Sequence, residues 1–207
     1  MSFFRQLIAV LALLCASYVQ AEGVAGAGYK VLGQPQPVAS GKKVQVQEFF
    51  FYGCSHCYHL HSLLSAWEKK MPKDVELQYV PVVFGESQEP MAKAFYALES
   101  MGKLKQLHDP LFVAWNVSGI DLSDEAKITE FVAKYGVDPA RFDAEYNSFS
   151  GSSKISRSNQ WVLSYGIRGT PTIIVDGKYA ITNLQPEDTI RVLDEVIKIA
   201  RKERSKR

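Results

Sequence analysis

The sequence contains few cysteines. Cys15 lies near the N-terminus, and only Cys54 and Cys57 follow residue 21. Two cysteines cannot form the disulfide framework that holds many small secreted domains together. Any disulfide within the chain after residue 21 must therefore join Cys54 to Cys57.

The sequence also lacks an excess of charge of either sign. Its 24 Lys and Arg residues nearly balance 22 Asp and Glu residues, which gives a formal net charge of +2. No basic stripe interrupts this balance, so a nucleic-acid partner is not expected. Hydrophobic residues make up 46% of the 207 residues, a composition typical of a globular protein and not of a disordered one.

The apolar run at residues 7–19 is shorter than the roughly 20 residues that span a membrane. It follows Arg5 and precedes small residues that end at Ala21, which predicts a secretory signal peptide over residues 1–21. A retained membrane anchor is the alternative. A lipid anchor on Cys15 is less favoured, because Leu13 and Leu14 stand where small residues are expected immediately before a lipidated cysteine. Export would place the chain in an oxidising compartment, where a disulfide can persist.

Strand and helix patterns flank a long helical block. Residues 43–52 and 75–84 have strand character, and residues 54–70 between them have helical spacing, which predicts a right-handed βαβ unit. Helical spacing continues over the next seventy or so residues without a strand. A hairpin at Asp176-Gly177 and a final helix from Pro186 follow. The pattern predicts an α/β fold with an all-helical insertion.

Three chemical roles are open to the Cys54-x-x-Cys57 pair. A structural disulfide across so short a loop would add only about 2 kcal/mol of stability. A zinc site could recruit His56, His59 and His61, but such sites usually need a second ligand cluster, and the remaining histidine is His108 in the helical block. The third role is a redox-active disulfide. We favour it and predict no metal and no cofactor.

The change from strand to helix period at Gly53 gives the two cysteines unequal positions. Cys54 lies at the helix start, where free N–H groups and the helix dipole favour a thiolate. Cys57 falls on the apolar stripe, where burial favours a protonated thiol. His56 can further stabilise the Cys54 thiolate through an N–H or a positive charge. A stabilised thiolate makes the disulfide a stronger oxidant, so we expect a disulfide donor.

Other residues are candidates for the same site. Pro171, after Thr170, is a candidate cis-proline whose preceding residue could bind an extended peptide, although an ordinary trans proline at a strand start remains the alternative. Glu48 shares strand parity with apolar residues and is expected to point inward near Cys57, where it could exchange a proton with that thiol. The alternative is a surface glutamate. We expect His59 and His61 to be surface residues.

Three segments together carry a family resemblance: "VQEFFFYGCSHCYHL", "IRGTPTIIVDGKY" and the helical block between them. The chain resembles the DsbA family of bacterial periplasmic thiol:disulfide oxidoreductases, which have a thioredoxin fold with an inserted all-helical domain. This resemblance implies a thioredoxin-like domain over residues 22–86 and 158–207 and an inserted helical domain over residues 87–157.

The resemblance also implies site roles and partners. Cys54 would form mixed disulfides with reduced exported polypeptides, and Cys57 would resolve them. Pro171 would be cis, Thr170 and Pro171 would border the site with Ser55, and Glu48 would match the family's acidic residue beneath the cysteines. A DsbB-like, quinone-linked oxidase of the inner membrane would reoxidise the pair in the periplasm. We expect a monomer.

The sequence departs from the best-known family pattern at three positions. Ser55 stands where proline is most familiar between the cysteines, Thr170 where valine often precedes the cis-proline, and His61 where the familiar protein has an acidic residue. The first two touch the site and leave the oxidising strength open. A disulfide isomerase or reductase, or a chaperone-like binder of unfolded exported chains, is the alternative function.

Overall fold

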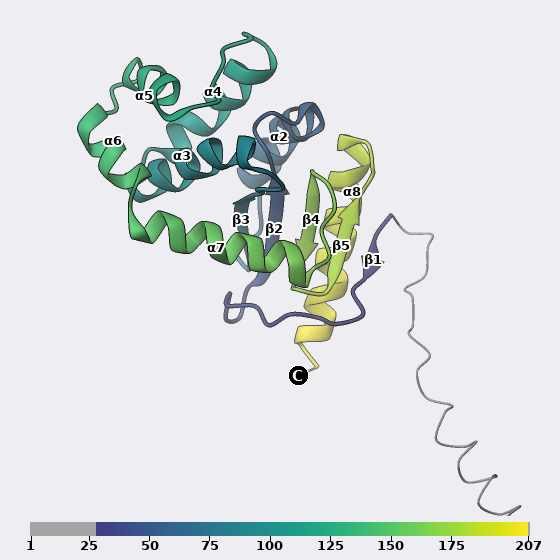
Figure 1. Ribbon diagram of the computed structural model, residues 1–207. Helices are drawn as coiled ribbons and strands as arrows, with labels where there is room; N and C mark the ends of the chain where they lie inside the picture. The colour runs from purple at the N-terminus through teal and green to yellow at the C-terminus, as the bar shows by residue number, and fades with distance from the viewer. Residues whose placement is uncertain (1–27, 207) are drawn as a thin grey trace, which may run out of the picture.

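The computed structural model describes residues 28–206, so the predicted signal peptide at residues 1–21 lies outside the described part (Figure 1). The predicted order of a βαβ unit, a helical block, a hairpin and a last helix is confirmed. The elements are β1 (Lys30–Val31), β2 (Val44–Phe50), α2 (Ser55–Glu68), β3 (Val75–Pro81), a 3₁₀ turn η1 (Glu86–Gln88), α3 (Glu89–Ser100), α4 (Leu104–Asn116), α5 (Glu125–Ala133), α6 (Pro139–Tyr146), α7 (Phe149–Ser164), β4 (Thr172–Val175), β5 (Tyr179–Thr182) and α8 (Pro186–Arg204).

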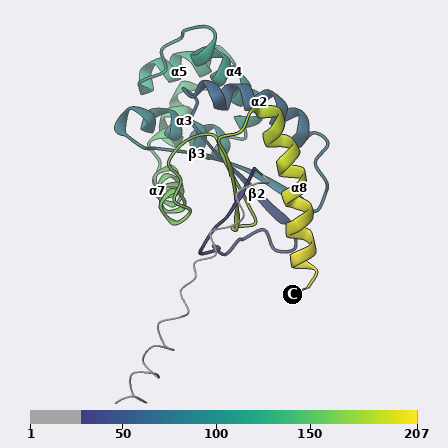
Figure 2. The same cartoon turned by 90° about the vertical axis from the view of Figure 1, so that its right-hand side faces the viewer.

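The strands form one five-stranded mixed sheet in the order β1-β5-β4-β2-β3. β2 runs parallel to β3 and antiparallel to β4, and α2 is the crossover that joins the parallel pair. All seven residues of β2 are buried, because this strand has neighbours on both edges and helices over both faces. Figure 2 shows α8 on one side of the sheet and α7 on the other.

Alternation along β2 divides its side chains between the two faces of the sheet. Val44 and Val46 pack with Leu64 of α2 and Val196 of α8 on one face. Phe49 packs with Tyr165, at the end of α7, on the other face. The helices therefore clamp a fully buried strand, and that strand leads directly into the Cys54 turn.

The β4–β5 hairpin turns at the predicted Asp-Gly pair. Asp176 has φ 54° and Gly177 has φ 63°, the left-handed conformation that a tight hairpin turn requires at both positions. A Cβ at position 177 would also lie 2.2 Å from the Gln36 carbonyl oxygen, so close packing requires glycine there as well. Arg204 of α8 binds the Asp176 carboxylate and fixes the turn to the last helix.

Helices α3 to α7 occupy the chain between β3 and β4, where no strand was predicted. They share an apolar core that includes Phe95, Leu98, Leu107, Leu111, Phe112, Ile128 and Phe142. α7 is unbroken across residue 157, with Ile155 in this core and Val162 in the core against the sheet. The division into residues 87–157 and the remainder stays a prediction.

One strand and one helix have boundaries that differ from those predicted from the sequence. The strand predicted to reach residue 84 ends at Pro81, and the helix predicted from residue 54 begins at Ser55 with Cys54 as its N-cap. Within residues 28–206, none of the helices is long and apolar enough to cross a membrane.

Candidate active site

The two cysteines lie where β2 ends and α2 begins, and both are free thiols. Cys54 has the extended backbone of an N-cap residue, and its Sγ accepts a hydrogen bond from the Cys57 N–H at 3.3 Å. Cys54 is half-buried, whereas Cys57 is 0% exposed among the apolar residues of α2. The predicted contrast in position between the two sulfurs is confirmed.

The surroundings of Cys54 lower its pKa to about 5. The largest cause is a hydrogen bond from the Cys57 side chain, and the backbone N–H groups of Cys57 and His56 add to it, while partial burial opposes the shift. Thr170 interacts with Cys54 in both the thiol and the thiolate state. Its carbonyl oxygen accepts from the Cys54 thiol at 3.4 Å, whereas its side chain stabilises the thiolate. Cys54 is therefore the sulfur of the pair that ionises more readily.

The surroundings of Cys57 act in the opposite direction. Burial raises the pKa of this thiol most, and the hydrogen bond to Cys54 and the charges of Glu48 and Cys54 raise it further. Cys57 therefore stays protonated while Cys54 ionises. The reduced pair holds one thiolate and one thiol at neutral pH.

The His56 side chain is exposed, and its effect on Cys54 comes through the backbone N–H. The imidazole lines a pocket of about 240 Å³ together with Thr170, Pro171 and Asn183. Sequence reasoning assigned the stabilising role to the His56 side chain. The described contact assigns it to the start of the α2 backbone instead.

Glu48 lies beneath the cysteines on β2 and is 0% exposed, as its strand parity predicted. Burial raises its pKa to about 8, and the charge of Cys54 adds to the shift. Both carboxyl oxygens lack a hydrogen-bond partner within the described residues. A carboxyl in this state is protonated at neutral pH and can give or take a proton near pH 8.

The Thr170–Pro171 peptide bond is cis, as the family resemblance implied. It precedes β4 and brings Thr170 within reach of Cys54, although the two residues are 116 positions apart in the sequence. Ser55 is exposed at the first position of α2. The residues expected at the site therefore converge on one end of the sheet, and Ser55 and His56 stand on its exposed rim.

The prediction that His61 is a surface residue is wrong. His61 is only 4% exposed, because α4 packs against this flank of α2 and stacks Phe112 on its ring, with the ring centroids 4.7 Å apart. His108 of α4 lies at 4.7 Å from the His61 ring, and Asp109 Oδ1 lies 3.6 Å from His61 Nε2. His59 is exposed, as predicted.

Sequence reasoning missed three α4 residues that contact the site. His108 Nδ1 shares a 2.7 Å hydrogen bond with the Tyr52 hydroxyl, and Asn116 donates to the Tyr52 carbonyl oxygen at 2.8 Å. Trp115 packs edge-on against Phe51. No local signal in the sequence marks these residues, because each contact joins segments more than fifty residues apart.

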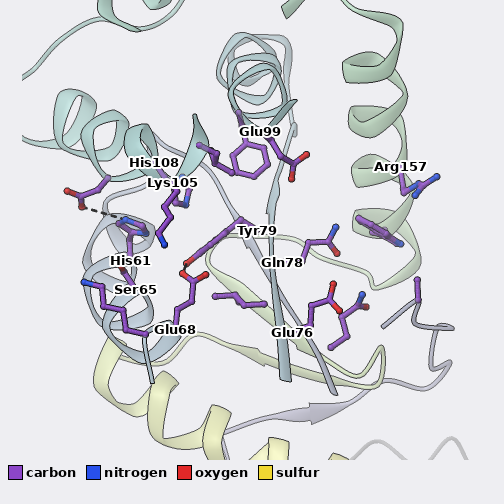
Figure 3. Close-up of a pocket in the computed structure, with 18 of the residues that line it drawn as sticks. His61, Ser65, Glu68, Glu76, Gln78, Tyr79, Glu99, Lys105, His108 and Arg157 are labelled. Carbon is purple, nitrogen blue, oxygen red and sulfur yellow. Dashed lines mark hydrogen bonds and ion pairs between the residues drawn. The ribbon is translucent and has the colours of Figure 1, made fainter. Parts of the chain in front are cut away.

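A larger hollow of about 1110 Å³ lies along the edge strand β3 (Figure 3). α2 and α4 border one side of it, with His61 and Lys105, and α7 borders the other, with Arg157. Neither cysteine lines this hollow, so it is separate from the redox pair. Across residues 28–206, no group of three or more His, Cys, Asp or Glu side chains is arranged to hold a metal ion.

The chain is similar to known proteins over most of its length. A family model described as a DSBA-like thioredoxin domain matches residues 85–193. The thiol:disulfide interchange protein DsbA of Burkholderia cepacia is 36% identical over 205 residues, which cover 94% of this chain and 96% of the relative. The protein of the same name from Pseudomonas aeruginosa is 33% identical and covers 84% of this chain and 83% of that relative.

Solved structures that are similar to this chain carry the same name as the sequence relatives. The crystal structure of Pseudomonas aeruginosa DsbA superimposes with a TM-score of 0.83 at 32% identity and covers 89% of this chain and 97% of that one. The oxidoreductase DsbA of Xylella fastidiosa gives a TM-score of 0.81 at 33% identity, with coverage of 86% and 98%. The predicted thioredoxin-type α/β fold with helical additions is confirmed. The chain belongs to the DsbA family of thiol:disulfide interchange proteins and is a thiol:disulfide oxidoreductase.

Proposed function

We propose that the protein donates the Cys54–Cys57 disulfide to reduced proteins newly exported to the periplasm. The observation that carries this proposal is the opposite environment of the two sulfurs, which lowers the pKa of Cys54 to about 5 and raises that of Cys57. A thiolate stabilised in the reduced protein favours reduction of its disulfide. Residues 1–21 would direct the export.

The reaction divides into two thiol–disulfide exchanges. A substrate thiolate attacks Cys54 Sγ, the intramolecular S–S bond breaks, and Cys57 leaves and takes the proton of the Glu48 carboxyl. A second substrate thiolate then attacks the substrate sulfur of the mixed disulfide, and Cys54 leaves as a thiolate. The substrate loses two electrons, and the protein gains them. Cys57 resolves a stalled mixed disulfide by attacking Cys54.

The substrate would bind beside the cis peptide bond. The pocket of about 240 Å³ between α2 and the strands β4 and β5 is lined by Thr170, Pro171 and His56, with Leu60 and Ile181 as apolar lining. Backbone groups next to Pro171 can pair with an extended chain, and the apolar lining accepts a side chain. An unfolded polypeptide presents both features, whereas a folded one presents few free backbone groups.

Each cycle leaves the protein reduced, so it needs an electron acceptor. We propose a DsbB-like, quinone-linked oxidase of the inner membrane whose disulfide is attacked by the thiolate of Cys54, the half-exposed sulfur, while the protein acts as a monomer. Membership of the DsbA family supports this partner. The reoxidation step is the same exchange run in reverse, with a disulfide of the partner as the oxidant.

Disulfide transfer to a reduced, unfolded model protein tests the proposal. The oxidised wild-type protein should form disulfides in the substrate, Cys54→Ser should abolish transfer, and Cys57→Ser, which has no internal disulfide to donate, should abolish it as well. Transfer that survives in Cys54→Ser would refute the proposal. Suppression of substrate aggregation by Cys54→Ser, without transfer by the wild type, would indicate the chaperone-like function instead.

The equilibrium with glutathione separates a disulfide donor from a reductase. We expect the Cys54–Cys57 pair to be reduced by a glutathione buffer that leaves structural disulfides intact. A pair that stays oxidised in that buffer would indicate a reductase.

A further inference from the structure

The end of α4 holds the turn that precedes Cys54. This turn is closed by a hydrogen bond from the Cys54 N–H to the Phe51 carbonyl oxygen at 3.0 Å. The Asn116 side-chain amide donates to the carbonyl oxygen of Tyr52, in the middle of the turn, at 2.8 Å. The same amide donates to the Phe112 carbonyl oxygen within α4 at 2.9 Å, so both of its hydrogens are used.

Two further α4 side chains contact the same turn. The Trp115 ring lies 6.1 Å from the Phe51 ring, and a Cβ at Gly53 would lie 2.9 Å from Trp115 Nε1. The Tyr52 hydroxyl is bonded to His108 Nδ1 at 2.7 Å. The turn is therefore fixed through its backbone by Asn116 and through its side chains by the residues around it.

The position of this turn determines where the Cys54 sulfur lies. Cys54 is the N-cap of α2, and its Sγ accepts from the Cys57 N–H at 3.3 Å. Hydrogen bonds weaken steeply as the angle and distance depart from their optimum. A small movement of the residues before Cys54 would therefore weaken the contacts that favour its thiolate.

We propose that Asn116 is a positioning residue for the nucleophile. By holding the Tyr52 carbonyl oxygen, its amide keeps Cys54 in the geometry that stabilises the thiolate, without touching the sulfur. The helical block would then contribute to the redox equilibrium of the pair as well as cover the sheet. This inference rests on the proposed redox role of Cys54.

The chain offers a matched control for this inference. Asn147 follows the last residue of α6, and its amide also donates to the carbonyl oxygen four residues earlier, that of Asp143, at 3.3 Å. Its amide also donates to the Asp143 and Glu125 carboxylates, which lie in the helical block. Asn147→Ala therefore removes a comparable helix-end amide whose hydrogen bonds lie within the helical block and away from the Cys54 turn.

The experiment measures the pKa of Cys54 by the ultraviolet absorbance of its thiolate, together with the glutathione equilibrium. Asn116→Ala should raise the pKa and shift the equilibrium toward the oxidised protein by about two- to fivefold, a part of what one lost hydrogen bond contributes. Asn147→Ala should change neither value. Near-ultraviolet circular dichroism verifies that each variant is folded.

Asn116→Ser provides a second, milder variant, because its short side chain cannot reach the Tyr52 carbonyl oxygen. A folded Asn116→Ala or Asn116→Ser protein with the wild-type pKa and equilibrium would overturn the inference. Failure of the proposed function gives a different result, since the wild type itself would then transfer no disulfide.

Discussion

The Glu48 carboxyl occupies a position where its charge is costly. It lies on the fully buried strand β2, and burial raises its pKa to about 8. An unfolded chain would have a glutamate pKa near its ordinary value of 4.5. Between these two values the folded protein binds more protons than the unfolded one, so this residue lowers stability as the pH rises from about 4.5 to 8.

Glu48→Leu should therefore stabilise the reduced protein at pH 7. The expected gain in the free energy of unfolding is roughly 2–4 kcal/mol, from 1.36 kcal/mol per pKa unit over the interval up to pH 7. Urea denaturation at pH 7 and pH 4 measures it, and the gain should shrink at pH 4, where the carboxyl is largely protonated in both states and only the cost of burying it without a partner remains. Disulfide transfer should become slower, because leucine cannot supply a proton to Cys57.

A gain that is equal at the two pH values would show that the effect comes from packing and not from the carboxyl. A loss of stability at pH 7 would contradict the raised pKa.

At the scale of elements, the contact between α2 and α4 changes what the sequence of α2 alone suggests. A helical wheel for α2 places Cys57, Leu60 and Leu64 on the buried face, and the structure agrees. The same wheel leaves His61 exposed, but Phe112 and His108 of α4 cover it. The position of α4 depends on tertiary packing, so the burial of His61 was not predictable from local periodicity.

The ionisation of His61 should report on this contact. Burial lowers its pKa, while Asp109 opposes the shift, and the other titratable groups that face it are His108 and Tyr79. The folded protein therefore binds fewer protons than the unfolded one below about pH 6.5, and stability is lost as the pH falls. His61→Phe keeps an aromatic ring against Phe112 and removes this loss.

Urea denaturation between pH 7.5 and 5 measures the difference. The free energy of unfolding of the wild type should fall more steeply with decreasing pH than that of His61→Phe. Parallel curves for the two proteins would mean that His61 stays solvated and ionises as in the unfolded chain.

At the same scale, the site residues divide by how local their signals are. Cys54 and Cys57 were predictable because the change of period at Gly53 lies within one short segment. Glu48 was predictable from the parity of a single strand. Asn116 was not, because its role depends on a hydrogen bond to a backbone carbonyl 64 residues earlier. Thr170 and Pro171 were candidates from the sequence itself, but only the family resemblance implied that they border Cys54.

At the scale of the whole molecule, the stability of the two redox forms follows from Cys54. The pKa of Cys54 in the folded, reduced protein is about 5, against an ordinary cysteine value of 9.0. The folded thiol thus binds fewer protons than the unfolded one between these values, and the reduced form gains stability as the pH rises from about 5 to 9. The oxidised form has no such thiolate.

We expect the reduced protein to unfold at a higher temperature than the oxidised protein at pH 7. One kcal/mol shifts Tm by about 2–4 °C in a chain of this size, so a difference of several degrees is expected. Calorimetry of both forms at pH 7 and pH 4.5 measures it, and the difference should shrink at the lower pH. A more stable oxidised form at pH 7 would contradict a strong oxidant.

The overall architecture was largely predictable, because each element has its own periodicity and the crossover rule fixes the βαβ unit. Which elements each helix packs against was less predictable. Helical spacing indicated a block between β3 and β4, but no pattern showed that one end of α7 joins the helical core and the other end the core against the sheet.

The continuity of α7 limits how the fold can be shortened or exchanged between relatives. A cut at residue 157 divides a helix whose far end packs against Phe49 through Tyr165. Removal of the helical block at that point would leave the sheet with a frayed partial helix and one weakened face. A chimera of two family members should therefore join them in the loop after Ser164, so that α7 is inherited whole.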